Sequence, residues 1–221
     1  MFTIILETLW ILESFSGWYS EGNLKNHWFS LEFSQSLAVI HDEKILKKGL
    51  EILKKMGFSP VLGKHVLAQD RYMAGTDAQR IEDLHDFFRA PQIKAIFCAR
   101  GGYGTSRILP SLDSSIIRKN PKILVGSSDI TLLILFLVQQ CSLVSFHGPM
   151  VAGNFGNYPM PKSKLQFSEI LLGKKVGKRL IANEARAFKS GTAEGRVIGG
   201  CLTLLCRSLG TPWEIKTRNK I

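Results

Sequence analysis

Apolar side chains from residue 42 onward are spaced alternately as in helices and as in strands. Asp42 can cap a helix that continues to Met56, where Gly57 provides a stop signal. The apolar positions of this helix fall on one face and are Ile45, Leu46, Leu50, Leu53 and Met56. Residues 58–62 follow as a short predicted strand.

A second helix is predicted to begin at Thr76 or Asp77 and to end near Arg89, because Pro91 disfavours helical geometry in the residue before it. The elements predicted after it are a buried strand over 93–99, a short helical stretch over 112–118, a buried strand over 122–126, an apolar helix over 130–140 and a strand over 143–146. Strands that alternate with helices at this spacing predict an α/β fold built on a parallel sheet.

The same pattern divides the chain into four predicted parts. An atypical N-terminal segment covers residues 1–38, and the α/β domain covers residues 39–150. Residues 151–190 are rich in Gly, Pro, Asn and Lys and are expected to form a linker. Residues 191–221 are predicted to be the start of an incomplete C-terminal domain.

Composition excludes two broad classes of protein. Of the 221 residues 45% are hydrophobic, with 13 Phe and 4 Trp, which is too much apolar volume for a mainly disordered chain. No apolar run reaches the roughly 20 residues that cross a bilayer, so no membrane partner is predicted. Residues 2–12 are apolar, but Glu7 interrupts them and no basic residue precedes them. A signal peptide is therefore not expected, and the cytoplasm is the predicted compartment.

The net charge of +11 is unevenly distributed along the chain. Residues 161–221 hold 13 basic and 4 acidic side chains, whereas residues 1–160 hold 16 and 14. A basic surface can bind nucleic acid or another anionic surface, and such a protein is one alternative. The basic stretch over residues 174–179 has no interleaved aromatic side chains to stack on bases, which favours a solvated surface and no nucleic-acid partner.

The four cysteines form no C-x-x-C pair and are too few for a disulfide framework. Cys98, Cys141, Cys201 and Cys206 are therefore expected to be buried thiols. Without a cluster of His, Cys, Asp and Glu at ligand spacing, the sequence predicts no metal site and no cofactor.

The segment with the clearest chemical potential is Ser127-Ser128-Asp129, between a predicted strand and a predicted helix. Ligands of doubly wound sheets bind at the carboxyl ends of strands, and amides at a helix N-terminus can hold an oxyanion, as a serine nucleophile requires. The alternative is that one of these side chains only caps the helix. The segment also lacks the last glycine of G-x-S-x-G, because Ile130 stands there.

Two further segments follow predicted strands. Glycines in residues 100–104 allow the main chain to approach a ligand closely, so an oxyanion or substrate-backbone role competes with a plain tight turn. No dinucleotide or P-loop pattern is satisfied there. His147 follows the strand over 143–146 and could be a general base, but a hydrogen-bonded structural histidine is the preferred interpretation.

Five ordered segments together resemble the LD-carboxypeptidase family, which includes murein tetrapeptide carboxypeptidases and microcin C self-immunity peptidases. They are YMAGTDAQRIEDL (72–84), IKAIFCARGGYGTSRILPSLD (93–113), NPKILVGSSDIT (120–131), LVSFHGPM (143–150) and GTAEGRVIGGCLTLLCRSLGTPW (191–213), within residues 40–216. The resemblance implies a flavodoxin-like (class I glutamine amidotransferase-like) α/β fold with helices on both faces of the sheet. It also implies a cytoplasmic serine peptidase of peptidoglycan recycling and suggests a homodimer.

By the same resemblance, the reaction is removal of the terminal D-alanine from a murein tetrapeptide. Ser128 matches the family nucleophile, with Ser127 where the family has Tyr. The amides of Asp129 and of Gly101 or Gly102 would form the oxyanion hole. No metal or cofactor is implied.

The sequence also departs from the family pattern. The family completes its triad with a Glu and a His beyond the segment that is here Gly210-Thr211-Pro212, and neither partner has a counterpart before Ile221. His147 matches a family segment that does not supply the base. The family's opening strand is not reproduced in residues 1–38, although residues 37–43 could supply part of it. A catalytically inactive, truncated remnant is therefore the alternative to an active enzyme.

Overall fold

The structure is a computed structural model of the whole chain, and it describes residues 30–33, 40, 42–157, 167, 170–171, 191–192 and 194–221. The chain forms two compact units. One comprises residues 27–161 and 199–215, and the other comprises residues 1–26, 162–198 and 216–221. The predicted division at residues 38, 150 and 190 stays a prediction.

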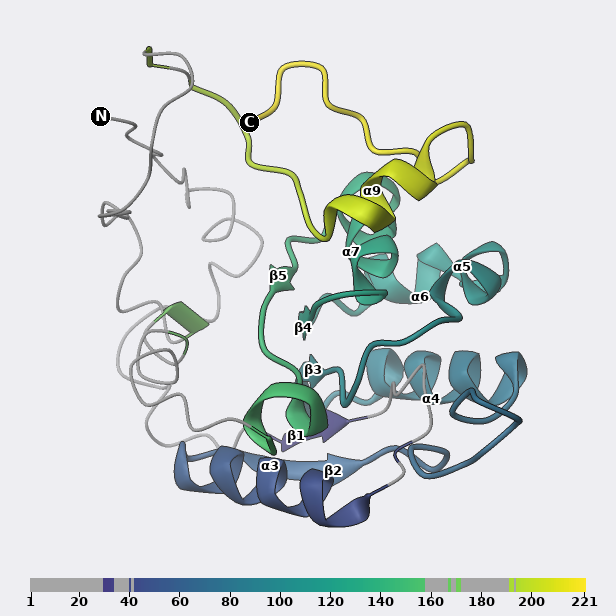
Figure 1. Cartoon of the computed structure of the whole chain (residues 1–221), viewed down its shortest axis with the longest axis vertical. Coiled ribbons are helices and arrows are strands. Elements are labelled where there is room, and N and C mark those ends of the chain that lie inside the picture. The colour runs from purple at the N-terminus through teal and green to yellow at the C-terminus, as the bar shows by residue number, and fades with distance from the viewer. Residues whose placement is uncertain are drawn as a thin grey trace. The chain divides into compact units, whose positions relative to one another are not determined.

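A five-stranded sheet forms the centre of the larger unit (Figure 1). Its strands are β1 (Ser30–Phe33), β2 (Ser59–Leu62), β3 (Ile93–Phe97), β4 (Ile123–Gly126) and β5 (Phe146–His147), in the order β2-β1-β3-β4-β5. All neighbouring strands are parallel, with Phe97 opposite Val125 and Gly126 opposite His147. This order is that of flavodoxin-like folds, as predicted. The carboxyl ends of β3, β4 and β5 consequently share one edge.

Helix α3 (Glu43–Lys55) begins where the sequence predicts, because the Asp42 carboxylate accepts a hydrogen bond from the Lys44 amide at 2.8 Å. It ends at Met56, and Gly57 takes the left-handed geometry expected of a stop residue. The predicted buried face is only partly correct. Leu46 and Leu53 are buried, whereas the other three predicted apolar positions are half-buried.

Helix α4 (Asp77–Arg89) is capped by Thr76, whose hydroxyl accepts from the Gln79 amide while the Gln79 side chain accepts from the Thr76 amide. The helices after it are α5 (Thr105–Ile108), the 3-10 turn η2 (Leu109–Ser111), α6 (Ser114–Lys119), α7 (Ile130–Gln140), the π-helical turn η3 (Val151–Phe155) and α9 (Leu202–Ser208). The predicted helical stretch 112–118 corresponds to α6, whereas α5 and η2 lie before it and were not predicted.

Two groups of helices cover the sheet (Figure 1). Helix α3 packs on η3, whereas α4 packs on α5 and α6, and α5 packs on α7. The core between these layers contains Phe88, Phe97 and the apolar side of α7, where eight successive residues from Ile130 to Leu137 are buried. No helix in the described ranges is both long and apolar enough to cross a membrane.

Some sequence predictions differ from the structure in detail. The first strand among the described residues is Ser30–Phe33. Of the segment 37–43, Asp42 and Glu43 belong to the start of α3, and residues 37–39 and 41 lie outside the described residues. The predicted strand 143–146 is reduced to Phe146–His147, because only these residues pair with β4. Residues 151–155 are helical rather than part of a linker.

The prediction of four buried thiols is half correct. Cys98 and Cys141 are buried, and burial raises the pKa of Cys98 to about 12. Cys201 is half-buried and Cys206 is exposed, since only Ser208 of α9 is buried. The basic stretch over residues 174–179, most of the predicted linker and His41 lie outside the described residues.

The smaller unit is described only in part. Its last residue pairs with an upstream segment, because the Ile221 amide donates to the Arg196 carbonyl and the Ile221 carbonyl accepts from the Ile198 amide, both at 2.9 Å. Arg196 and Lys220 form an isolated parallel bridge beside these bonds.

Candidate active site

A sharp strand-to-helix turn presents Ser128 at the carboxyl end of β4. Ser128 has a φ of +58°, in the left-handed region that non-glycine residues rarely adopt. The helix begins at once, because the Ile130 amide donates to the Ser127 carbonyl and the Thr131 amide donates to the Ser128 carbonyl. Ser128 is exposed although both flanking elements are buried. Strained backbone of this kind clusters at functional sites and is typical of a nucleophilic serine turn.

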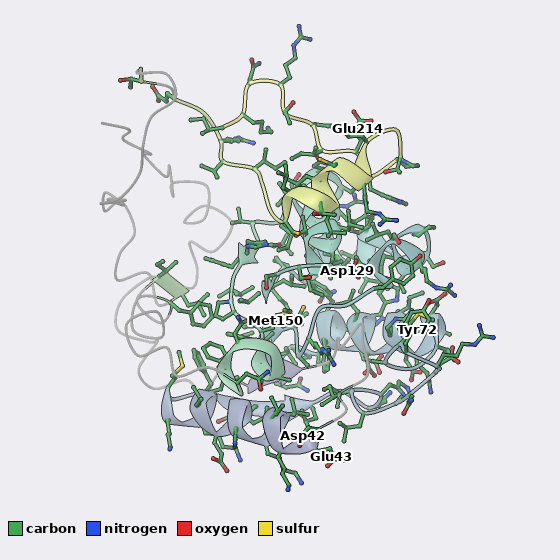
Figure 2. All side chains as sticks on the ribbon, viewed as in Figure 1. Asp42, Glu43, Tyr72, Asp129, Met150 and Glu214 are labelled. Atoms are coloured by element: carbon green, nitrogen blue, oxygen red, sulfur yellow. The ribbon has the colours of Figure 1, made fainter. Side chains whose placement is uncertain are left out.

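The glycine loop, defined as residues 100–104, reaches Ser128 from the end of the neighbouring strand β3. A Cβ placed on Gly101 would lie 2.9 Å from the Ser128 Cβ and 3.2 Å from its Oγ. Only glycine therefore allows the loop to come this close without displacement. The Met150 side chain lies on the same side of Gly101, and Figure 2 labels both Met150 and Asp129 at this edge. The predicted residues Ser128 and Gly101 are thus brought together.

Three amides around Ser128 are unused by the rest of the described chain. The N–H groups of Gly101, Gly102 and Asp129 donate no hydrogen bond to any described residue. The Gly101 and Asp129 residues are buried, while Gly102 is exposed. Amides beside an accessible hydroxyl are the donors that stabilise an oxyanion in acyl transfer.

Asp129 does not cap α7, which argues against the capping alternative. No side chain caps this helix. The Asp129 carboxylate is 3% exposed, and its Oδ2 accepts from the Thr105 amide at 2.9 Å. Burial raises the pKa of this carboxyl above its ordinary value, although the amides of Thr105 and Gly104 and the charge of Arg80 oppose the shift.

Neither His147, the candidate general base, nor Glu214 is hydrogen-bonded to Ser128. His147 pairs with Gly126 on the neighbouring strand. Its side chain is partly desolvated, and this lowers its pKa. Glu214 accepts from the Gly210 amide at 2.7 Å and so stabilises a turn. Within the described residues, His, Cys, Asp and Glu form no cluster that could hold a metal ion.

One ionic network beside the glycine loop was not foreseen from the sequence. Arg80 is 2% exposed, donates to the Gly75 carbonyl at 2.7 Å and pairs with Asp77. Asp77 also accepts three hydrogen bonds from Arg107 of α5, at 2.8, 3.0 and 3.1 Å. A signal was available, because Arg80 occupies the same face of α4 as the buried Leu84 and Phe87.

Comparison with known proteins agrees with this geometry. The family model for the LD-carboxypeptidase N-terminal domain matches residues 33–148. A probable murein peptide carboxypeptidase of Bacillus subtilis is 40% identical over 181 residues, which cover 81% of this chain and 57% of the relative. The murein tetrapeptide carboxypeptidase of Pseudomonas aeruginosa is 37% identical, over 76% of this chain and 56% of that protein.

A solved structure has the same fold. The MccF-like protein from Bacillus anthracis superposes with a TM-score of 0.77 and 26% identity, covering 87% of this chain and 66% of that one. This chain spans a little more than half the length of the curated relatives it matches.

Proposed function

The chain belongs to the LD-carboxypeptidase family, and on this basis we propose that it is a serine peptidase with Ser128 as its nucleophile. The proposed substrate is a murein tetrapeptide, from which the enzyme removes the terminal D-alanine during peptidoglycan recycling. The single observation that carries this proposal is the strained, exposed Ser128 turn packed against Gly101.

The proposed reaction is acyl transfer. The Ser128 Oγ attacks the carbonyl carbon of the residue before the D-alanine, and its proton passes to a base. The negative charge that develops on the carbonyl oxygen would be stabilised by the amides of Asp129 and of Gly101 or Gly102, which supports their assignment as an oxyanion hole. Collapse of the tetrahedral intermediate breaks the C–N bond, and the D-alanine amine leaves with a proton. Water then hydrolyses the acyl-enzyme.

The base that accepts the serine proton is not among the hydrogen-bond partners of Ser128 in the described chain. The described residues therefore offer a nucleophile and oxyanion donors for acylation, whereas the group that takes the serine proton is still to be identified. We propose a cytoplasmic location, because all four cysteines are free thiols, as is typical of reducing compartments. A homodimer is proposed from the family resemblance.

The test treats the purified chain with a biotinylated fluorophosphonate, which forms a P–O bond to an activated serine and releases fluoride. We expect modification at Ser128, identified by peptide mass spectrometry, and its loss in Ser128→Ala. Ser127→Ala is the matched control and should still be modified. Modification of Ser127 and Ser128 at equal rates, or of neither, would contradict the proposed nucleophile.

A second assay measures D-alanine release from the murein tetrapeptide. Release that depends on Ser128 would support a complete enzyme. Modification of Ser128 without release would show that the serine is activated but that this peptide is not turned over. Absence of both would favour the inactive alternative, in which no base takes the serine proton.

A further inference from the structure

The Asp129 carboxylate joins two segments that meet at Ser128. It belongs to the turn that carries the serine, yet it accepts its hydrogen bond from Thr105, the first residue of α5. Thr105 follows the glycine loop directly. The bond therefore connects the Ser128 turn to the far end of the loop whose near end contacts Ser128.

The glycine loop needs a bond at its far end because its glycines can adopt many backbone conformations. Gly102 and Gly104 have φ values of +131° and +133°, which favour glycine, and glycine loses more conformational freedom on ordering than any other residue. The near end is held by η3, whose Ala152 amide donates to the Ala99 carbonyl at 2.9 Å. The far end is held by the bond from Thr105 to Asp129.

The bond between Asp129 and Thr105 requires the Asp129 carboxylate to be buried. Asp129 is 3% exposed, and a buried charge is costly unless hydrogen bonds and an opposite charge compensate it. The amide of Thr105 supplies a charge-assisted bond, and the Arg80 guanidinium lies next to the loop, since a Cβ on Gly104 would be 3.4 Å from its Nη2. A side chain that merely capped α7 would not require this burial.

We propose that the Asp129 carboxylate is a positioning residue that holds the glycine loop, and with it the Gly101 amide, in place beside the Ser128 hydroxyl. The inference rests on the proposed function, in which that amide stabilises the oxyanion. Asp129 would thus contribute twice, through its amide at the site and through its carboxylate at the loop.

The experiment compares Asp129→Ala and Asp129→Asn with the wild-type chain. Asparagine can still accept from the Thr105 amide, whereas alanine cannot. Two quantities are measured, the hydrogen-exchange rate of the amides of residues 101–105 and the rate of Ser128 modification by the fluorophosphonate. Asp113→Ala is the matched control, because it removes a comparable bond, from the Ser115 amide to the Asp113 carboxylate at 2.8 Å, at the start of α6.

We expect Asp129→Ala to raise exchange at Thr105 at least tenfold and to slow Ser128 modification at least tenfold. Asp129→Asn should restore both rates to within about threefold of wild type, and Asp113→Ala should change neither. Unchanged modification in Asp129→Ala, or an equal loss in the alanine and asparagine variants, would overturn the inference. If the alanine variant does not fold, unprotected exchange at Thr105 in the wild-type chain overturns it instead.

These outcomes separate the inference from the proposed function. Absence of Ser128 modification in the wild-type chain would contradict the function. The exchange rates of residues 101–105 in the variants would still report whether Asp129 holds the loop.

Discussion

Gly101 is the residue whose substitution tests the site most directly. A Cβ at this position would lie 2.9 Å from the Ser128 Cβ, a separation that real Cβ contacts essentially never show. We expect Gly101→Ala to displace the loop and slow Ser128 modification by at least tenfold, in line with the 10²–10³-fold effect of losing an oxyanion donor. The rate with a fluorophosphonate probe measures this.

The control for Gly101→Ala is Gly153→Ala in η3. A Cβ there would meet only the Met150 side chain, at 3.5 Å, which is ordinary contact. This variant should keep the wild-type rate. Equal rates in Gly101→Ala and wild type would show that the loop does not approach Ser128 as closely as the structure places it.

The raised pKa of Asp83 predicts that its contribution to stability falls as pH rises. Its side chain is 2% exposed and accepts from the His65 amide at 3.0 Å, and burial raises its pKa. Asp83 therefore contributes stability below the unfolded pKa of about 3.9 and loses that contribution as pH rises through the folded pKa. We expect the Tm of Asp83→Asn, relative to wild type, to increase between pH 3.5 and pH 7.

Asp113→Asn is the opposing control. Hydrogen bonds from Ser115 lower the pKa of Asp113, so its contribution is present above the unfolded pKa and is lost as pH falls. The Tm of this variant relative to wild type should decrease over the same pH range. Thermal unfolding monitored by circular dichroism measures both, and parallel slopes for the two variants would contradict the assignment.

The site itself was only partly predictable from residues. Ser128 could be found because a polar triplet follows an apolar strand and precedes an apolar helix. The contact between Gly101 and Ser128 was expected only through the family resemblance, because no local pattern shows that β3 and β4 are neighbours in the sheet. The bond from Thr105 to Asp129 joins residues 24 positions apart for the same reason, and no local pattern signals it.

At the scale of elements, the cap of α4 carries a measurable share of stability. Thr76 and Gln79 form a reciprocal capping box, with bonds of 3.3 and 2.9 Å. Loss of such a cap costs about 1 kcal/mol. We expect Thr76→Ala to lower the free energy of unfolding by about that amount in urea denaturation. Thr217→Ala, at an exposed position, should change it little, and an equal effect of both would contradict the role of the cap.

Element boundaries were predictable where local chemistry was strong. The helix Ile130–Gln140 and the cap of α4 agree with the sequence patterns because each has an unambiguous start signal or a continuous apolar run. The strand Ser30–Phe33 was missed because the polar residues Ser30 and Glu32 leave it without a continuous apolar run, unlike β4. β5 was misplaced because the apolar residues before Phe146 pack without pairing. The positions of both strands depend on pairing with distant strands of the sheet, which a local sequence pattern does not report.

At the scale of the larger unit, residues 199–215 pack on α7, although they lie about 60 residues or more further along the chain. The Cys201 amide donates to the Thr131 hydroxyl at 3.1 Å, and the Gln139 side chain donates to the Glu214 carbonyl at 3.1 Å. The rings of Phe136 and Trp213 meet edge to face at 5.8 Å. Because Thr131 lies three residues after Ser128, this packing supports the helix that begins at the candidate site.

We expect Trp213→Ala to release this segment from α7, because the substitution removes the ring that packs against Phe136. Amide exchange in α9 should rise at least tenfold while exchange in α3 stays unchanged, as measured by peptide-level mass spectrometry. Tyr72→Ala, which removes an exposed aromatic ring from the Tyr72–Tyr103 pair, is the control and should leave α9 protected. If α9 exchanged equally fast in wild type and Trp213→Ala, its attachment to α7 would not depend on this ring, and the hydrogen bonds to Thr131 and Glu214 would have to hold it.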